Sequence, residues 1–343
     1  MCISFQVYFD YGLLPIAYGP LALCLSAFGL QFKKKRLQKY KILIFAEFLN
    51  LFFMAEHFRY HRKERVLIFF IILLISGLIG VGISMVFASA GDMGIKIAQG
   101  LSSIMLFVVP PIVYYRVTRT RHPMESLGFR DVAKPSYLYI VIGVALMFIS
   151  LPVTNQLTRW NEAMNFGGVF PQLEEYIKQL EEMAATVTEK MLKVDTFGGL
   201  LLNLLVIALI PAVGEELTFR GVLQQGLVRR MKSPHLAIIL SAAIFSFIHF
   251  QFYGFLPRMF LGILLGYMFY ITRSLWTSIT MHFVNNGTAV VLYYLNNKGI
   301  IEIDPETFGS TQYLWLAIIS LVVTAALIGW CWWKVENDTK KIR

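Results

Sequence analysis

Repeated apolar runs, each close to the length of a membrane-crossing helix, constrain this chain more than any other feature. A helix needs roughly 20 residues to cross a hydrocarbon core. Seven runs approach or exceed that length without strand-like alternation, at residues 66–88, 97–117, 137–157, 197–213, 236–250, 276–295 and 313–333. A weaker run covers residues 12–30. The sequence therefore predicts an all-α fold, a polytopic membrane helical bundle with about 7–8 transmembrane helices.

Composition and charge support a membrane protein. The chain is 57% hydrophobic and 15% charged, whereas about a quarter of the residues of a soluble domain are charged. The formal net charge of +10 comes from basic loops beside the apolar runs, at residues 33–36, 59–65, 116–134, 229–232, 273 and 340–343. The positive-inside rule places these loops in the cytoplasm and the acidic 159–195 loop outside. We expect an integral, multi-pass protein that contacts membrane lipid and no nucleic acid.

The order of the apolar runs divides the chain into five segments. They are an N-terminal accessory segment (1–65), the first membrane spans (66–158), an outer loop (159–195), a four-helix core (196–295), and the last span with a cytoplasmic tail (296–343). The accessory segment combines one possible span with an interfacial helix at 41–54, and we interpret it as an upstream extension of a core that starts near Met54. In the outer loop, apolar residues recur every three or four positions from Leu173 to Val187. This spacing predicts an amphipathic extramembrane helix, and a solvated connector is the alternative.

Polar side chains inside three of the runs carry the functional information. Ionisable residues within spans cost about 2.5–3.5 kcal/mol each and usually mark function. They concentrate in residues 214–221, 245–249 and 282–286. At 1.5 Å rise per residue, Glu215 and His249 both lie about 21 Å from the basic turn that joins their helices, and Asn286 lies about 20 Å from Arg273. The three segments are therefore expected to place polar groups at nearly one depth.

Helical spacing sorts these residues by their partners. Glu216 and Arg220 are four residues apart in the order that favours an ion pair, and Glu215 is rotated about 100° away from Glu216. A carboxylate beside a histidine can deprotonate water, which is general-base chemistry. His282 and Asn286 share one helix face and suit an oxyanion.

Simpler interpretations exist for each of these groups taken alone. Glu216 and Arg220 form a neutralising pair in a purely structural interpretation, and an intramembrane histidine often serves only as a hydrogen-bonding group between helices. Their convergence at one depth favours a catalytic site. A non-proteolytic transporter, or an immunity or scaffold protein that uses the same polar cluster for binding, is the alternative, although no internal repeat typical of transporters is present.

The three motifs together resemble those of a known enzyme family. The patterns Glu215-Glu216-x-x-x-Arg220, Phe245-x-x-x-His249 and His282-x-x-x-Asn286 are similar to those of the CAAX-protease and bacteriocin-processing (CPBP, Abi) family, which is type II CAAX prenyl endopeptidase-like. The resemblance covers residues 195–295, under a third of the chain.

The resemblance implies a role for each motif residue and a reaction. By this resemblance, Glu215 and His249 would activate water, and His282 and Asn286 would form the oxyanion hole. Glu216 and Arg220 would support the site. It also implies an intramembrane protease with a membrane-associated protein or peptide as substrate, in a prokaryotic cytoplasmic membrane. The sequence does not indicate whether that substrate is a prenylated protein, a bacteriocin or a leader peptide.

Metal dependence is the main alternative left open by the residues. Glu215, His249 and His282 could hold Zn²⁺ or another divalent metal with one open position for water. The set lacks the compact spacing of an H-E-x-x-H zinc helix, and this favours a metal-free, glutamate-dependent mechanism. The three cysteines, at positions 2, 24 and 331, are too scattered to specify a disulfide framework or a metal site.

Overall fold

The computed structural model describes residues 62–87, 91–118, 122–129, 136–164, 170–302, 305 and 307–342, and these residues contain helices and no strands. The predicted all-α fold is therefore confirmed. The helices are α5 (Arg62–Phe87), α6 (Gly91–Ser103), η2 (Ile104–Val108), α7 (Val109–Val117), α8 (Pro123–Leu127), α9 (Ser136–Ile149), α10 (Leu151–Glu162), α11 (Pro171–Leu192), α12 (Phe197–Asn203), η3 (Leu204–Leu209), α13 (Ile210–Glu216), η4 (Leu217–Gln224), α14 (Gln225–Val228), α15 (Pro234–Phe247), α16 (Phe255–Thr272), α17 (Leu275–Asn297) and α18 (Leu314–Ile342). The expected span at 12–30 and the expected interfacial helix at 41–54 lie outside the described residues.

Five helices among the described residues are long and apolar enough to cross a membrane. They are Arg65–Phe87, Gly91–Val117, Phe197–Val228, Phe255–Thr272 and Leu314–Asn337. A bent pair, Tyr137–Ile149 with Leu151–Glu162, raises the number to six if it forms one span. The predicted count of 7–8 is not confirmed.

Two of the predicted runs differ from simple spans for clear physical reasons. The run at 137–157 bends by 45° between α9 and α10, where Pro152 lies in the first turn of α10. Proline has no N–H and its ring clashes with the preceding turn, so a straight helix cannot pass through it. The run at 236–250 forms a helix of only 14 residues, Pro234–Phe247, because the chain turns at His249.

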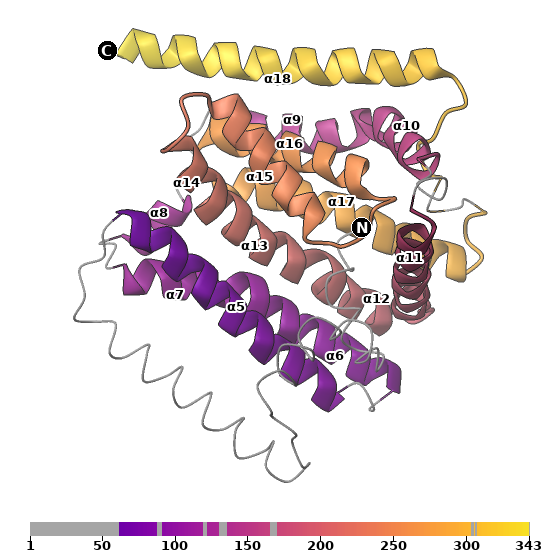
Figure 1. Cartoon of the computed structure of the whole chain (residues 1–343). Helices are drawn as coiled ribbons and strands as arrows, with labels where there is room; N and C mark the ends of the chain where they lie inside the picture. The colour runs from indigo at the N-terminus through magenta and orange to yellow at the C-terminus, as the bar shows by residue number, and fades with distance from the viewer. Residues whose placement is uncertain are drawn as a thin grey trace.

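The helices pack in layers around one long central segment (Figure 1). Helices α12 to α14, with η3 and η4, form the single span Phe197–Val228. Helices α5, α6 and α7 lie on one side of this segment, and α15, α16 and α17 lie on the other. Helix α18 lies outermost, against α9, α10 and α16. This arrangement leaves the central segment with protein on both sides.

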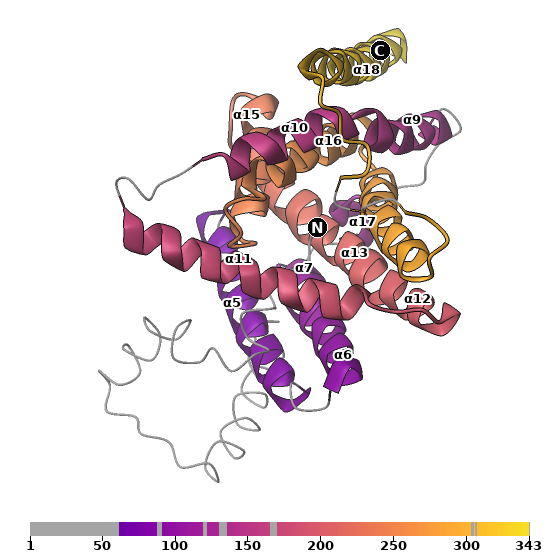
Figure 2. The same cartoon turned by 90° about the vertical axis from the view of Figure 1, so that its right-hand side faces the viewer.

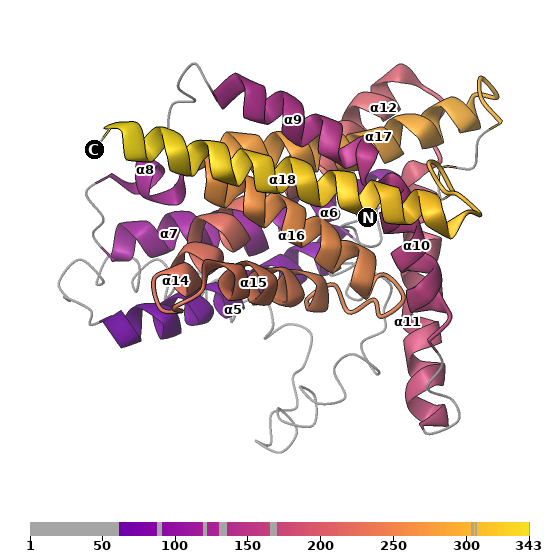
Figure 3. The same ribbon diagram turned by 90° about the horizontal axis from the view of Figure 1, so that it is seen from above.

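Helix α11 is the predicted amphipathic helix, and it forms over Pro171–Leu192. Figures 2 and 3 show that it crosses the end of the bundle instead of running alongside the spans. Its apolar positions Ala184, Val187, Met191 and Leu192 are buried against Ile95 and the central segment. The helix is therefore packed on the bundle along these positions.

Candidate active site

The carboxylate of Glu216 is the central acceptor of a buried polar cluster. Glu216 is fully buried, and Arg220 is 1% exposed. One carboxylate oxygen, Oε1, accepts a bond from Arg220 Nη1 at 2.8 Å and another from His282 Nδ1 at 3.0 Å. The pair that the four-residue spacing predicts is therefore present. The contact to His282 was not predicted, because helix spacing describes only partners on the same helix.

His282 lies between the two glutamates. Its Nδ1 atom contacts Glu216, and its Nε2 atom is 3.8 Å from Glu215 Oε2, beyond hydrogen-bond distance. Because the Glu216 carboxylate also accepts from Arg220, it is an acceptor toward His282, and the imidazole donates through Nδ1–H. The histidine thus brings the first and third sequence motifs into direct contact.

The Phe245 ring connects His249 to the same cluster. Phe245 is fully buried, and its centroid is 5.0 Å from that of His249 and 6.1 Å from that of His282. The Arg220 guanidinium lies 5.0 Å from the ring centroid. His249 Nδ1 is 2.7 Å from the carbonyl oxygen of Phe245. A carbonyl only accepts, so Nδ1 carries the proton and Nε2 of neutral His249 is the basic nitrogen.

Asn286 is buried beside the central segment, and its Nδ2 atom donates to the Ile207 carbonyl at 3.4 Å. Its side-chain oxygen accepts a bond from Asn285 Nδ2 at 3.1 Å. Pro211 follows Ile207 by four residues and has no N–H, so it cannot give that carbonyl the usual helical bond. The proline therefore leaves an acceptor at the position where Asn286 approaches.

A second proline acts in the same way on the opposite side of the central segment. Pro111 follows Phe107 by four residues, and the Phe107 carbonyl accepts a bond from the Thr218 hydroxyl at 2.8 Å. The π-helical segments η2 and η3 contain Phe107 and Ile207, and such segments are frequent at functional sites. Both prolines thus convert helical carbonyls into acceptors for side chains near the cluster.

Close approach of α16 completes the surroundings of Arg220. The Nη2 atom of Arg220 donates to the Gly262 carbonyl at 2.9 Å, and one turn later Gln224 donates to the Gly266 carbonyl at 2.8 Å. A Cβ atom at position 262 would lie 3.0 Å from Cβ and 3.2 Å from Cα of Ala242. Glycine therefore favours this close approach of the helices, because a side chain here would push Ala242 away.

The turn after His249 is held by groups from three other places. Arg258 donates to the Gln251 side chain and to its carbonyl, Asn161 accepts from the Leu256 N–H at 2.7 Å, and Glu181 of α11 accepts from the Tyr253 N–H at 2.9 Å. Burial raises the pKa of Glu181, and the Tyr253 hydrogen bond partly opposes that shift. These contacts fix the backbone next to His249.

The predicted metal ligands do not form a metal centre. Among the described residues, no group of three or more His, Cys, Asp or Glu side chains could hold a metal ion. Nδ1 of His282 and Nδ1 of His249 are engaged with Glu216 and the Phe245 carbonyl. Nε2 is then the ring nitrogen of each histidine that a metal would need, but Glu215, His249 and His282 are not placed as a group that could hold a metal ion, and a metalloprotease is not supported.

The sequence did not predict the residues that support the six predicted site residues. Phe245 was recognised only as part of a motif, and Gly262 and Arg258 were not selected. Glycines spaced by four residues on α16 are a usable signal for a close helix contact. No sequence pattern indicates that Arg258 would hold the turn after His249.

The comparison with known proteins agrees with the motifs. Residues 197–288 match the family model described as Type II CAAX prenyl endopeptidase Rce1-like. No match is found among curated proteins or among solved structures. The matched segment begins with α12 and ends within α17, so it contains all six predicted site residues. Residues 197–288 are thus similar to the Rce1-like domain of type II CAAX prenyl endopeptidases, as the three motifs indicate.

Proposed function

We propose that the chain is an intramembrane endopeptidase that hydrolyses a peptide bond of a membrane-associated protein or peptide, with water activated by Glu215 and His249. One observation carries the proposal. The segment that matches a peptidase family holds two glutamates, an arginine and two histidines in one buried cluster joined by His282 and Phe245. Burying so many ionisable groups is costly, and a purely structural role needs only the Glu216–Arg220 pair.

The reaction is a direct attack by water. Glu215 takes a proton from the water, and the Nε2 atom of His249 accepts the water's other hydrogen bond. The water oxygen bonds to the carbonyl carbon of the peptide, and the carbonyl oxygen becomes an oxyanion. The carbon–nitrogen bond then breaks, and the leaving nitrogen takes the proton held by Glu215. The products are a carboxylic acid and an amine, the acid then loses its remaining proton to the amine or to solvent, and no covalent enzyme intermediate forms.

His282 is suited to the oxyanion only in its doubly protonated form. Its Nδ1–H donates to Glu216, so a donor to substrate must be Nε2–H. The cluster holds two carboxylates and one guanidinium, and a protonated His282 brings its formal charge to zero. Glu216 with Arg220 would thus maintain the charge of His282, while Asn286 supplies a second donor. Removing one oxyanion donor typically costs about 10²–10³ in rate.

The test is cleavage of a prenylated reporter peptide by the full chain in liposomes. Glu215→Gln is expected to lower turnover by about 10²–10⁴ and to leave peptide binding nearly unchanged. His249→Ala should do the same. The double variant should be little worse than either single one, because residues that act as a unit are not additive.

Two controls make the result interpretable. Glu182→Gln removes one carboxylate from the exposed face of α11 and should keep wild-type turnover. Thermal unfolding of each variant separates a chemical defect from a folding defect. Full cleavage by Glu215→Gln would falsify the assignment of this site and favour a binding role for the cluster. Loss of cleavage on chelation, restored by Zn²⁺, would overturn the metal-free mechanism.

A further inference from the structure

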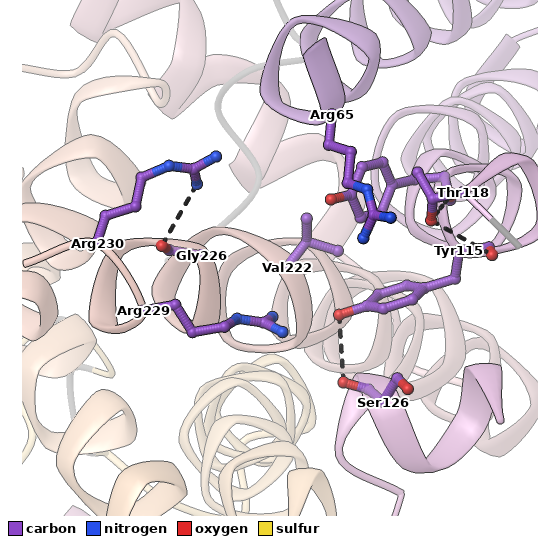
Figure 4. A pocket seen from close by; sticks show the side chains of 9 residues that line it. Arg65, Tyr115, Thr118, Ser126, Val222, Gly226, Arg229 and Arg230 are labelled. Atoms are coloured by element: carbon purple, nitrogen blue, oxygen red, sulfur yellow. Dashed lines mark hydrogen bonds between the residues drawn. The ribbon is translucent and has the colours of Figure 1, made fainter. Parts of the chain in front are cut away.

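A second site is visible at one end of the bundle, away from the glutamates. A cavity of about 290 Å³ lies between α5, α7, α8 and the end of the central segment. It is lined by Arg65, Tyr114, Tyr115, Thr118, Ser126, Val222, Gly226, Arg229 and Arg230. These nine residues include three arginines and no acid (Figure 4). A cavity with this lining selects an anion.

The arginines are directed by the surrounding helices. Figure 4 shows Arg65 and Arg229 extending toward the space over Val222 and the Tyr115 ring, whereas Arg230 curves back over Gly226. Arg229 is fixed by a bond from its Nε to the Gln225 carbonyl at 3.0 Å. Among the described side chains, no carboxylate lies within 4.0 Å of Arg65 or Arg229. An anion from outside would therefore lower the electrostatic cost of placing these guanidinium groups around one cavity.

The floor of the cavity is preformed. The Tyr115 hydroxyl donates to the Gly221 carbonyl at 2.9 Å and lies 3.2 Å from the Ser126 carbonyl. These bonds tie α7 and α8 to the central segment. The Thr118 hydroxyl donates to the Tyr114 carbonyl. The Tyr115 and Thr118 side chains are thus held in place by the protein itself.

The depth of the cavity indicates the source of the anion. Arg65 begins one candidate span, Thr118 directly follows the end of a second at Val117, and Arg229 directly follows the end of a third at Val228. Three spans thus end around the cavity, which places it at the level of lipid headgroups. The same three ends belong to basic loops, which the positive-inside rule assigns to the cytoplasmic leaflet, where anionic lipids attract basic residues.

We propose that this cavity binds a phosphate group, with the headgroup of an anionic phospholipid as its source. Guanidinium groups match phosphate in a planar, two-point geometry. The volume accommodates a phosphate-bearing headgroup, and the acyl chains would lie outside along α5. The site is independent of the proposed proteolysis, since none of its residues belongs to the glutamate–histidine cluster.

The test is a binding titration on the purified full chain in a neutral detergent. Phosphatidylglycerol is compared with phosphatidylcholine of the same acyl chains, and inorganic phosphate forms a third arm. The double variant Arg65→Gln, Arg229→Gln should bind phosphatidylglycerol about tenfold or more weakly, because each removes a charge-assisted bond. The matched control is Arg116→Gln, Lys232→Gln. It removes the same charge from two exposed residues near the same membrane face that do not line the cavity.

The outcomes separate the alternatives. Saturable binding of phosphatidylglycerol alone, lost in the cavity variant and retained in the control, supports the proposal. Equal loss in both variants, or equal binding of phosphatidylcholine, overturns it. Saturation by inorganic phosphate without lipid retains the anion site and overturns the lipid source. Melting without lipid checks folding, and if the double variant is unstable, the single variant Arg65→Gln, at an exposed position, carries the test.

Discussion

The central span Phe197–Val228 and the outer helix α5 have similar apolar sequences and opposite surroundings. In the most apolar 18-residue stretch of the central span, 39% of the residues are buried. In the corresponding stretch of α5, 22% are buried. The outer helix exposes Leu67, Leu74 and Val86 by 60% or more, as expected for contact with lipid. The central span instead buries Glu215, Glu216 and Arg220. Both helices qualify as membrane spans by hydropathy, and their ionisable residues separate the central span from the lipid-facing one.

The contrast also explains why buried charge is tolerated in one helix. Each charged group of the central span has a partner from another helix, such as His282 for Glu216 and the Gly262 carbonyl for Arg220. Lipid offers no such partners, so the outer helix α5 has none of these groups in the middle of its span. Substitutions that remove a partner should therefore act strongly in the central span and weakly in the outer helices.

The largest effect on folding is expected at Glu216. Glu216→Gln leaves the Arg220 guanidinium as an uncompensated cation in the interior and weakens the bond from His282, a loss of about 3–5 kcal/mol in stability. Glu215→Gln should cost less, because the nearest histidine nitrogen is 3.8 Å from the Glu215 carboxylate. Thermal unfolding in detergent measures both variants. Equal melting temperatures would contradict the division between a supporting and a catalytic glutamate.

This division shows how far the sequence could predict the site. The pairing of Glu216 with Arg220 follows from spacing along one helix, and the structure contains it. The contact from His282 depends on how α17 packs against the central segment, and no spacing along a single helix encodes that. The prolines lie between these cases. The sequence shows that Pro211 leaves the Ile207 carbonyl without its usual helical donor, but only the packing shows that Asn286 approaches it.

The fold divides in a similar way. Long apolar runs predicted the helices, because a chain in lipid must satisfy its backbone bonds within each segment. The bend between α9 and α10 and the shortness of α15 were missed, since hydropathy averages over both. Pro152 was a local signal for the bend. The packing of α11 on the bundle was left open because amphipathic spacing gives a face and not its partner.

An intermediate effect on stability is expected when a glycine is replaced by alanine, once beside the central span and once in the outer helix α5. Gly262→Ala puts a methyl group 3.2 Å from a backbone atom of Ala242, and overpacking of this kind costs about 1–3 kcal/mol. Gly82→Ala in α5 meets nothing within 4 Å and should stabilise its helix by about 0.5–1 kcal/mol, since alanine loses less backbone entropy than glycine.

Unfolding of both glycine variants under identical detergent conditions gives the measurement. Opposite signs would support the contrast between a helix surrounded by protein and one surrounded by lipid. Destabilisation of similar size at both positions would mean that α5 is packed against another surface in the membrane. The cleavage assay adds a second reading, because Gly262 also supplies the carbonyl that holds Arg220.

The smallest effect is expected outside the membrane, where α11 contacts the turn after His249. Burial raises the pKa of Glu181 above its ordinary value of 4.5, so the folded state holds this proton more tightly than the unfolded state. The stabilisation is fully present below the unfolded pKa and is lost as the pH rises from 4.5 through the folded-state pKa.

Glu181→Gln keeps an acceptor for the Tyr253 N–H and removes the titration. The difference in melting temperature between wild type and this variant should therefore change over that pH window, in the direction that disfavours wild type at higher pH. Glu182→Gln, an exposed neighbour on the same helix, corrects for the change in net charge. A constant difference between wild type and Glu181→Gln, from below pH 4.5 to neutral, would show that Glu181 titrates alike in both states and that burial does not shift its pKa.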